Sequence, residues 1–320
     1  MASSSKEDGS KVQYVAEGTP LEDIIGFMKR DGVVIVRQLV SPADIDQAYE
    51  EIRPCLEQRP RWNGSFFPKE TQRTPNLIAI SPTYTRTQMM NPLFHQLCNH
   101  FLTTRSWNWW GDEWSETVSR PYISATSALR VGPGAKAQPL HRDDYVSHNY
   151  IVESPMFNYR QQVSITMIVA GCKVTKENGG TQFIPGSHLW HVPTNYLGPE
   201  QFVDMFDRPN PPKVTDCTYA SMEKGDALVL FSSLYHGGGH NTTTDEHRLV
   251  FTTCAIRGYF RQEENQYLAV PMQRVREYDR DTQKFIGYSM SEPACGHADE
   301  MDPIYLVHPE ELETAEPIQF

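Results

Sequence analysis

Two histidines and one aspartate have the types and spacing of a metal site. His141 and Asp143 are separated by one residue in the run QPLHRD, so at a strand end their side chains point to the same face. His236 follows a short apolar run that we expect to be a buried strand. Two imidazoles and one carboxylate cover one face of an octahedron and leave three positions open, as in iron(II) oxygenases. A zinc hydrolase is an alternative, because catalytic zinc also binds three protein ligands and a water.

Arg248 adds a second kind of chemistry to this set. It lies at the start of the β-rich run 249–256, and a guanidinium there can hold a carboxylate through two hydrogen bonds. The cosubstrate 2-oxoglutarate chelates iron through its keto acid end and needs such a partner for its far carboxylate. Fe(II), 2-oxoglutarate and O2 are therefore the cofactor and cosubstrates that the four residues predict.

Other histidines near these residues are interpreted differently. His240 is four residues after His236, but the three glycines between them disfavour a helical pair of ligands. His188 and His191 have no carboxylate close by in the sequence, and we expect structural roles for both. His148 is a candidate for the pocket wall.

Short β-rich segments are expected to position these groups. Runs rich in Val, Ile, Thr and Tyr alternate with turn residues at 124–131, 163–169, 181–184, 227–231 and 249–256. The pattern predicts a mostly β protein with flanking helices, and the double-stranded β-helix (jelly roll, as in cupins) is its best match. The expected organisation is a disordered N-terminus at 1–15, a jelly-roll domain with a helical N-terminal part at 16–290, and an acidic C-terminal arm at 291–320.

The expected helices lie mainly before this β-rich region. Thr19 is predicted to be the N-cap of a helix with Pro20 in its first position, and Gly32 should end that helix. Ser41-Pro42 should begin a second helix, and apolar residues at helical spacing predict a third at 91–103.

Composition narrows the class of partner and the compartment. The net charge is −11 and the sequence has no basic stripe, which argues against nucleic acid and anionic membranes as partners. No apolar run reaches the length of a membrane span, and residues 1–11 lack the apolar centre of a secretory signal. The 6 cysteines form no CxxC pair, which is typical of reduced thiols in a cytoplasmic protein. We interpret the tryptophan-rich stretch 107–114 as core or pocket wall.

Several motifs together resemble the phytanoyl-CoA dioxygenase family of iron(II)- and 2-oxoglutarate-dependent oxygenases. They are DGVVIV, PLHRD, ENGGT with IPGSH, and a distal motif, at 31–36, 139–143, 177–188 and 225–241. Within that family, the segment RQEENQYLAVP at 261–271 is similar to one found in the fungal oxygenases of secondary metabolism.

The resemblance implies a dioxygenase that oxidises a hydrophobic small molecule, a terpenoid or alkaloid intermediate, by hydroxylation, desaturation or rearrangement. It implies that Gln138 and Thr181 contact 2-oxoglutarate beside Arg248, and it makes Asn76 a candidate polar group of the pocket. Many proteins of this branch are homodimers, so we expect a homodimer here. Two alternatives stay open: an acyl-CoA or lipid hydroxylase of the same family, and a metal-binding jelly roll without activity.

Overall fold

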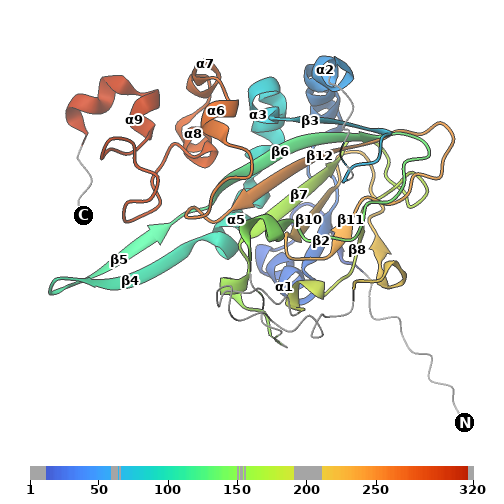
Figure 1. Ribbon diagram of the computed structural model, residues 1–320, viewed down its shortest axis with the longest axis horizontal. Helices are drawn as coiled ribbons and strands as arrows, with labels where there is room; N and C mark the ends of the chain where they lie inside the picture. Colours follow the sequence, from blue (N-terminus) through green and yellow to red (C-terminus); the bar gives the residue numbers. More distant parts are fainter. Residues whose placement is uncertain are drawn as a thin grey trace, which may run out of the picture.

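A seven-stranded sheet runs through the computed structural model, which describes residues 12–58, 64, 66–149, 151, 154, 156–190 and 211–315 (Figure 1). The strands are β1 (Tyr14–Val15), β2 (Val33–Val36), β3 (Thr71–Pro75), β4 (Thr104–Trp110), β5 (Glu113–Ser119), β6 (Tyr122–Val131), β7 (Ser164–Ala170), β8 (Gln182–Phe183), β9 (Thr218–Tyr219), β10 (Ala227–Phe231), β11 (His236–Gly237) and β12 (Arg248–Ile256). The large sheet has the order β1-β2-β10-β7-β12-β6-β3, a small sheet has the order β11-β8-β9, and β4 pairs with β5.

Helices cover one side of the large sheet and extend beyond its edge (Figure 1). They are α1 (Leu21–Asp31), α2 (Pro42–Gln58), α3 (Leu77–Ile80), α4 (Pro82–Tyr84), α5 (Pro92–Leu102), α6 (Gln266–Ala269), α7 (Met272–Arg276), α8 (Arg280–Ile286) and α9 (Ile304–Val307). The predicted mostly β protein with flanking helices is confirmed at this level. Among the described helices, none is long and apolar enough to cross a membrane.

The central strand β10 is apolar along its whole length because both of its faces are buried. On β10, Val229 and Phe231 face the helical side, where the main core lies, whereas Leu228 and Leu230 face the small sheet. Alternate residues of a strand point to opposite faces, so an unbroken apolar run is what a covered strand requires. The face of the large sheet that lies toward the small sheet also carries the polar pocket described below. Ile168 belongs both to the apolar core on this face and to the pocket wall.

The first helix differs from the expectation at its N-terminus. It begins at Leu21 with Pro20 as N-cap and no side-chain cap, and the Thr19 hydroxyl donates instead to the Ala16 carbonyl. The prediction of Thr19 as N-cap was therefore wrong, because a local turn uses its hydroxyl. Gly32 ends the helix as predicted, with the left-handed φ of 77° that glycine adopts easily.

The other expected helices are confirmed. The second begins at Pro42, where the Ser41 hydroxyl accepts a hydrogen bond from the Asp44 N–H. The third spans Pro92–Leu102, within one residue of the expected bounds, and the side chain of Asn91 caps it.

The expected disorder before residue 16 is wrong for residues 12–15, and residues 1–11 lie outside the described part. Tyr14 and Val15 form β1, which pairs in parallel with β2. Val15 is buried in the main core, and that apolar contact together with two edge hydrogen bonds to β2 holds the strand in place.

The expected C-terminal arm is also corrected, for residues 291–315. The segment folds back onto α7 and α8, where Ile304 and Val307 join the main core. The Arg276 side chain donates to the Val307 carbonyl, and the His308 ring lies 2.7 Å from the side-chain oxygen of Gln283. The acidic composition of the segment gave no indication that Ile304 and Val307 are core residues.

The tryptophans at 107–114 are neither core nor pocket wall, which overturns that interpretation. They lie on the β4–β5 hairpin, which projects away from the body of the protein (Figure 1). Each of their side chains is half exposed or more. Trp107, Trp109 and Trp114 form one cluster, with ring centroids 5.1 Å and 6.2 Å apart. We call this feature the tryptophan hairpin.

Candidate metal centre and cosubstrate pocket

His141 and His236 are brought together by their own backbones. They face each other in an isolated antiparallel bridge, and each N–H donates to the carbonyl of the other at 2.9 Å. Their rings lie 4.7 Å apart between centroids. The sequence predicted that these two side chains meet, and the bridge is the physical reason that they do.

Each of the two imidazoles is oriented by the residue two positions before it. Nδ1 of His141 lies 2.8 Å from the Pro139 carbonyl, and Nδ1 of His236 lies 2.9 Å from the Leu234 carbonyl. A carbonyl can only accept, so each Nδ1 carries the proton and donates. Both Nε2 atoms are thereby left as free electron pairs, which is the arrangement that metal-binding histidines show.

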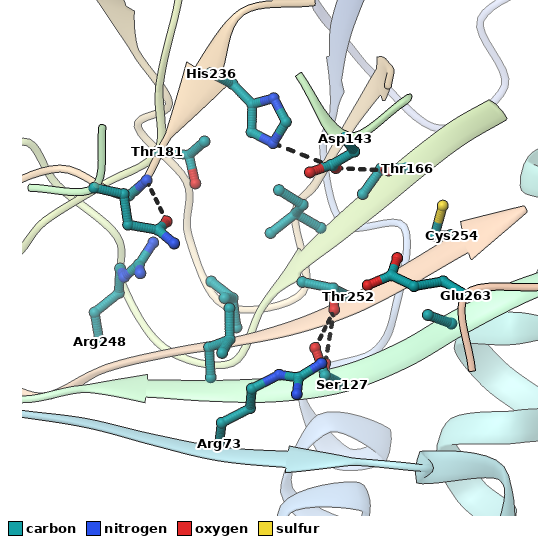
Figure 2. Close-up of a pocket in the computed structure, with 16 residues that line it drawn as sticks. Arg73, Ser127, Asp143, Thr166, Thr181, His236, Arg248, Thr252, Cys254 and Glu263 are labelled. Carbon is teal, nitrogen blue, oxygen red and sulfur yellow. Dashed lines mark hydrogen bonds and ion pairs between the residues drawn. The ribbon is translucent and has the colours of Figure 1, made fainter. Parts of the chain in front are cut away.

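Asp143 completes the set from the first turn of a short 3-10 helix, Asp143–Ser147, and not from the strand that we expected. Its two carboxylate oxygens lie 3.5 Å from Nε2 of His141 and 3.5 Å from Nε2 of His236. The three donor atoms all lie within 4.8 Å of one another (Figure 2). One nitrogen from each ring and one oxygen thus converge on a point that a metal ion fits.

The charges of this cluster favour a cation. Burial alone would raise the pKa of Asp143, but the rings of His236 and His141 hold it well below its usual value. Burial would lower the pKa of His236, but the Asp143 carboxylate raises it overall. Asp143 therefore stays ionised. A bound cation would take over the attraction that its carboxylate has for the two histidine rings.

Arg142, between the two ligands, pairs with Asp144 and not with the metal cluster. Its side chain is buried and donates to the Asp144 carboxylate at 2.6 Å. Asn149 donates to the same oxygen of Asp144, also at 2.6 Å. This buried pair fixes the two residues on either side of Asp143, so it holds the turn that carries the carboxylate.

Arg248 lies at the other end of the same pocket (Figure 2). Its guanidinium is buried, Nε has no hydrogen-bond partner, and no carboxylate of the described residues pairs with it. Burial lowers the pKa of Arg248 to about 10. A buried cation without a counter-charge is costly, so the site fits an anionic ligand such as the far carboxylate of 2-oxoglutarate.

Gln138 and Thr181 line this pocket near Arg248, as the resemblance implied. The N–H of Gly238 donates to the side-chain oxygen of Gln138 at 2.8 Å, and the N–H of Gln138 donates to the Gly238 carbonyl. A β-carbon on Gly238 would lie 2.9 Å from that side-chain oxygen, and one on Gly239 would lie 2.6 Å from the Gly180 carbonyl. Gly239 therefore leaves no room for a side chain against the Gly180 backbone, and a side chain at Gly238 would displace Gln138.

Asn76 does not belong to this pocket, which corrects the expectation. Its side chain donates to the Ala269 carbonyl at 2.6 Å, and its N–H donates to the Glu264 carboxylate at 3.2 Å. With a left-handed φ of 59°, Asn76 joins β3 to α3 and ties both to α6. An asparagine beside a strand end can line a pocket or hydrogen-bond to neighbouring backbone, and the sequence around Asn76 does not distinguish these two roles.

The remaining histidines of the sequence analysis have other positions. His188 is buried, and its Nε2 lies 3.1 Å from the Lys29 carbonyl, which agrees with the expected structural role. His148 and His240 are not among the residues that line the pocket. His191 lies outside the described residues.

Sequence reasoning missed the far side of the pocket. Arg73 enters from β3, and Glu263 enters from the segment after β12 (Figure 2). Thr252 and Cys254 share a strand face with Arg248, so the two-residue period of β12 could have indicated them. No comparable signal existed for Arg73, since β3 has no apolar alternation.

The family model of the phytanoyl-CoA dioxygenases matches residues 28–249. The chain belongs to the phytanoyl-CoA dioxygenase family. The dioxygenase cnsJ of Penicillium expansum is 34% identical over 291 residues, which cover 90% of this chain and 82% of that protein. The dioxygenase peniF of Penicillium patulum is 33% identical over 294 residues, covering 90% and 89%. These relatives are fungal, which confirms the resemblance to the fungal branch.

Solved structures show the same fold. The epimerase SnoN of nogalamycin biosynthesis, in complex with Fe3+, alpha ketoglutarate and nogalamycin RO, has a TM-score of 0.53 and 20% identity, covering 78% of this chain and 88% of that one. The carbocyclase SnoK has a TM-score of 0.53 and 14% identity, covering 81% and 93%. With the family membership and the converging triad, the chain is an Fe(II)- and 2-oxoglutarate-dependent dioxygenase that uses O2.

Proposed function

We propose that this dioxygenase acts in fungal secondary metabolism, where it hydroxylates, desaturates or rearranges a hydrophobic terpenoid or alkaloid intermediate. The proposal is supported by the relatives from Penicillium and by the 261–271 segment. We also propose that the two sheets close as a double-stranded β-helix and that the protein is a cytoplasmic homodimer. The tryptophan hairpin supports the dimer, because exposed large apolar side chains that cluster together are typical of an interaction surface.

We assign the metal to His141, Asp143 and His236 and the far carboxylate of 2-oxoglutarate to Arg248, with Gln138 and Thr181 beside it. The observation that carries the assignment is the placement of an uncompensated buried guanidinium in the same cavity as the triad. Fe(II) with 2-oxoglutarate and O2 supplies an oxidant that takes hydrogen from an unactivated carbon.

The residues that line the cavity determine which carbon of the substrate reacts. His141, His236 and Asp143 would hold the metal from one side, so the cosubstrates and the substrate would approach it from the cavity. Asp143 argues against halogenation, because a halide needs the coordination position that its carboxylate fills. The reaction type within the oxidative class depends on how the cavity wall holds the substrate.

The experiment that tests the function has two stages. First, anaerobic protein with Fe(II) and 2-oxoglutarate should develop a weak visible charge-transfer band. Second, succinate release should rise above the basal rate with members of a panel of terpenoids, alkaloids and acyl-CoAs. Stimulation by acyl-CoAs alone would favour the lipid hydroxylase. A protein that binds iron without producing the band would be a metal-binding relative without this activity.

A further inference from the structure

Glu263 holds a fixed position at the edge of the pocket. Its N–H donates to the Ser124 hydroxyl at 3.1 Å, and the neighbouring Gln262 side chain donates to the Ile123 and Ile286 carbonyls at 2.9 Å and 2.7 Å. These bonds attach the segment after β12 to β6 and to the end of α8. The side chain lines the cavity, and Figure 2 shows its carboxylate there.

The Glu263 carboxylate has no hydrogen bond or ion pair with any of the described residues, although its backbone is well bonded. The residue is exposed and part of its surface faces the cavity, where partial desolvation raises the pKa of its carboxyl group and Asp143 raises it further. Arg73 attracts it and lowers the pKa in part. A partly desolvated carboxylate stays ionised at a lower free-energy cost when a bound ligand donates a hydrogen bond to it.

The position of Glu263 relative to the cofactors indicates what that ligand is. In Figure 2, Arg248 and Thr181 lie at one end of the cavity, Asp143 lies between, and Glu263 lies at the other end. With 2-oxoglutarate held at the Arg248 end, Glu263 is on the side left to the substrate.

The cavity has two charged side chains besides Asp143 and Arg248, which are Arg73 and Glu263. The guanidinium of Arg73 lies 5.5 Å from the centroid of the Phe67 ring, so it already contacts an aromatic face. Apart from Asp143, Glu263 is the only carboxylate among the described residues that line the pocket, so it is the anionic acceptor available to a substrate.

We propose, on the basis of the function proposed above, that Glu263 binds a protonated amine of the substrate, so that this dioxygenase acts on a basic alkaloid intermediate and not on a neutral terpenoid. The ammonium group forms a charge-assisted hydrogen bond to the carboxylate and anchors the molecule. The anchored nitrogen fixes which carbon lies next to the metal, and Glu263 is thereby a specificity-determining residue.

The test compares matched amines and alcohols on the loaded protein without turnover. Anaerobic protein with Fe(II) and 2-oxoglutarate is titrated by calorimetry with tryptamine and tryptophol, and with phenethylamine and 2-phenylethanol. Within each pair the molecules differ mainly in the amine and the hydroxyl. We expect the amine to bind at least about tenfold more tightly. Equal affinities in both pairs, or no binding of either amine at millimolar concentration, would overturn the proposal.

Three variants make the test specific. Glu263→Gln should abolish the preference for amines, whereas Arg73→Gln should strengthen amine binding because it removes a cation near the carboxylate. Glu277→Gln makes the same change on the exposed end of α7 and should have no effect. If Glu263→Gln keeps the preference, or Arg73→Gln loses it, the carboxylate does not recognise the amine.

The visible band separates this inference from the proposed function. It should form with unchanged 2-oxoglutarate affinity in all three variants, which also shows that they are folded. If the wild type gives no band, the proposed function fails whatever the amines do. If the band forms and the amines show no preference, the proposed function stands and the role of Glu263 is refuted.

Discussion

The imidazole of His188 lies against the α-carbon of Gly32, so closely that a β-carbon at position 32 would clash with Nδ1 of the ring. The ring also stacks 5.6 Å from Phe231, between centroids, and Nε2 donates to the Lys29 carbonyl. His188 thus joins the end of α1 to β10. Burial lowers the pKa of His188 to about 4, so the folded protein holds the ring neutral.

This histidine should make stability depend on pH. Between about pH 6.5 and pH 4 the unfolded chain binds a proton at this position and the folded chain does not, so stability falls as the pH falls through this range. The full effect is on the order of 3 kcal/mol. In His188→Phe, urea unfolding should show a smaller loss between pH 6.5 and pH 4 than in the wild type. Parallel curves for the two proteins would show that another group carries the dependence.

Asp143→Ala should remove iron binding. The variant loses the one anionic donor of the cluster and leaves two imidazoles, so we expect Fe(II) affinity to fall by at least about a hundredfold. Calorimetry under anaerobic conditions measures this change. Asp23→Ala, on the exposed first turn of α1, is the matched control and should bind iron normally. Retained affinity in Asp143→Ala would place the metal elsewhere.

Arg248→Met should separate the cosubstrate from the metal. The substitution keeps an unbranched side chain of similar reach and removes the charge, so 2-oxoglutarate affinity should fall about a hundredfold, whereas Fe(II) affinity should change little. Titration of the visible band with 2-oxoglutarate gives the first value, and calorimetry gives the second. The change Arg274→Met, at a partly exposed residue on α7, should alter neither. Equal losses of both ligands would contradict the assigned role.

The tryptophan hairpin should determine the oligomeric state. Replacing Trp107 and Trp109 together by serine removes two members of the exposed cluster, and we expect the dimer to dissociate at micromolar concentration. Sedimentation velocity measures the change. Leu268→Ser is the control, because its side chain is 85% exposed on α6, away from the hairpin. A double variant that sediments like the wild type would exclude the hairpin from the interface.

The sequence was sufficient wherever local chemistry and spacing determined the outcome. His141 and Asp143 are two residues apart, and either a strand end or the observed 3-10 turn brings them together. The apolar runs of β7, β10 and β12 were predicted because buried strands need them. Arg248 was placed correctly because it opens such a run.

The rest depended on packing between distant segments, which local pattern does not encode. The tryptophans of β4 and β5 were expected inside the protein, because large aromatic residues usually are buried. Glu263 and Arg73 come from segments 190 positions apart, and only the assembled sheet places both on one cavity. The residues that select the substrate were therefore the hardest to predict.

The backbone bridge between His141 and His236 has a consequence for how this protein obtains its metal. Because backbone hydrogen bonds set the spacing of the two imidazoles, the pair offers nitrogen donors to several divalent cations and not to Fe(II) alone. Nickel and zinc bind nitrogen and oxygen donors more tightly than ferrous iron does. Correct metallation must then be set by supply in the cell, and a purified sample will contain active enzyme only after chelation and reloading with Fe(II) under argon.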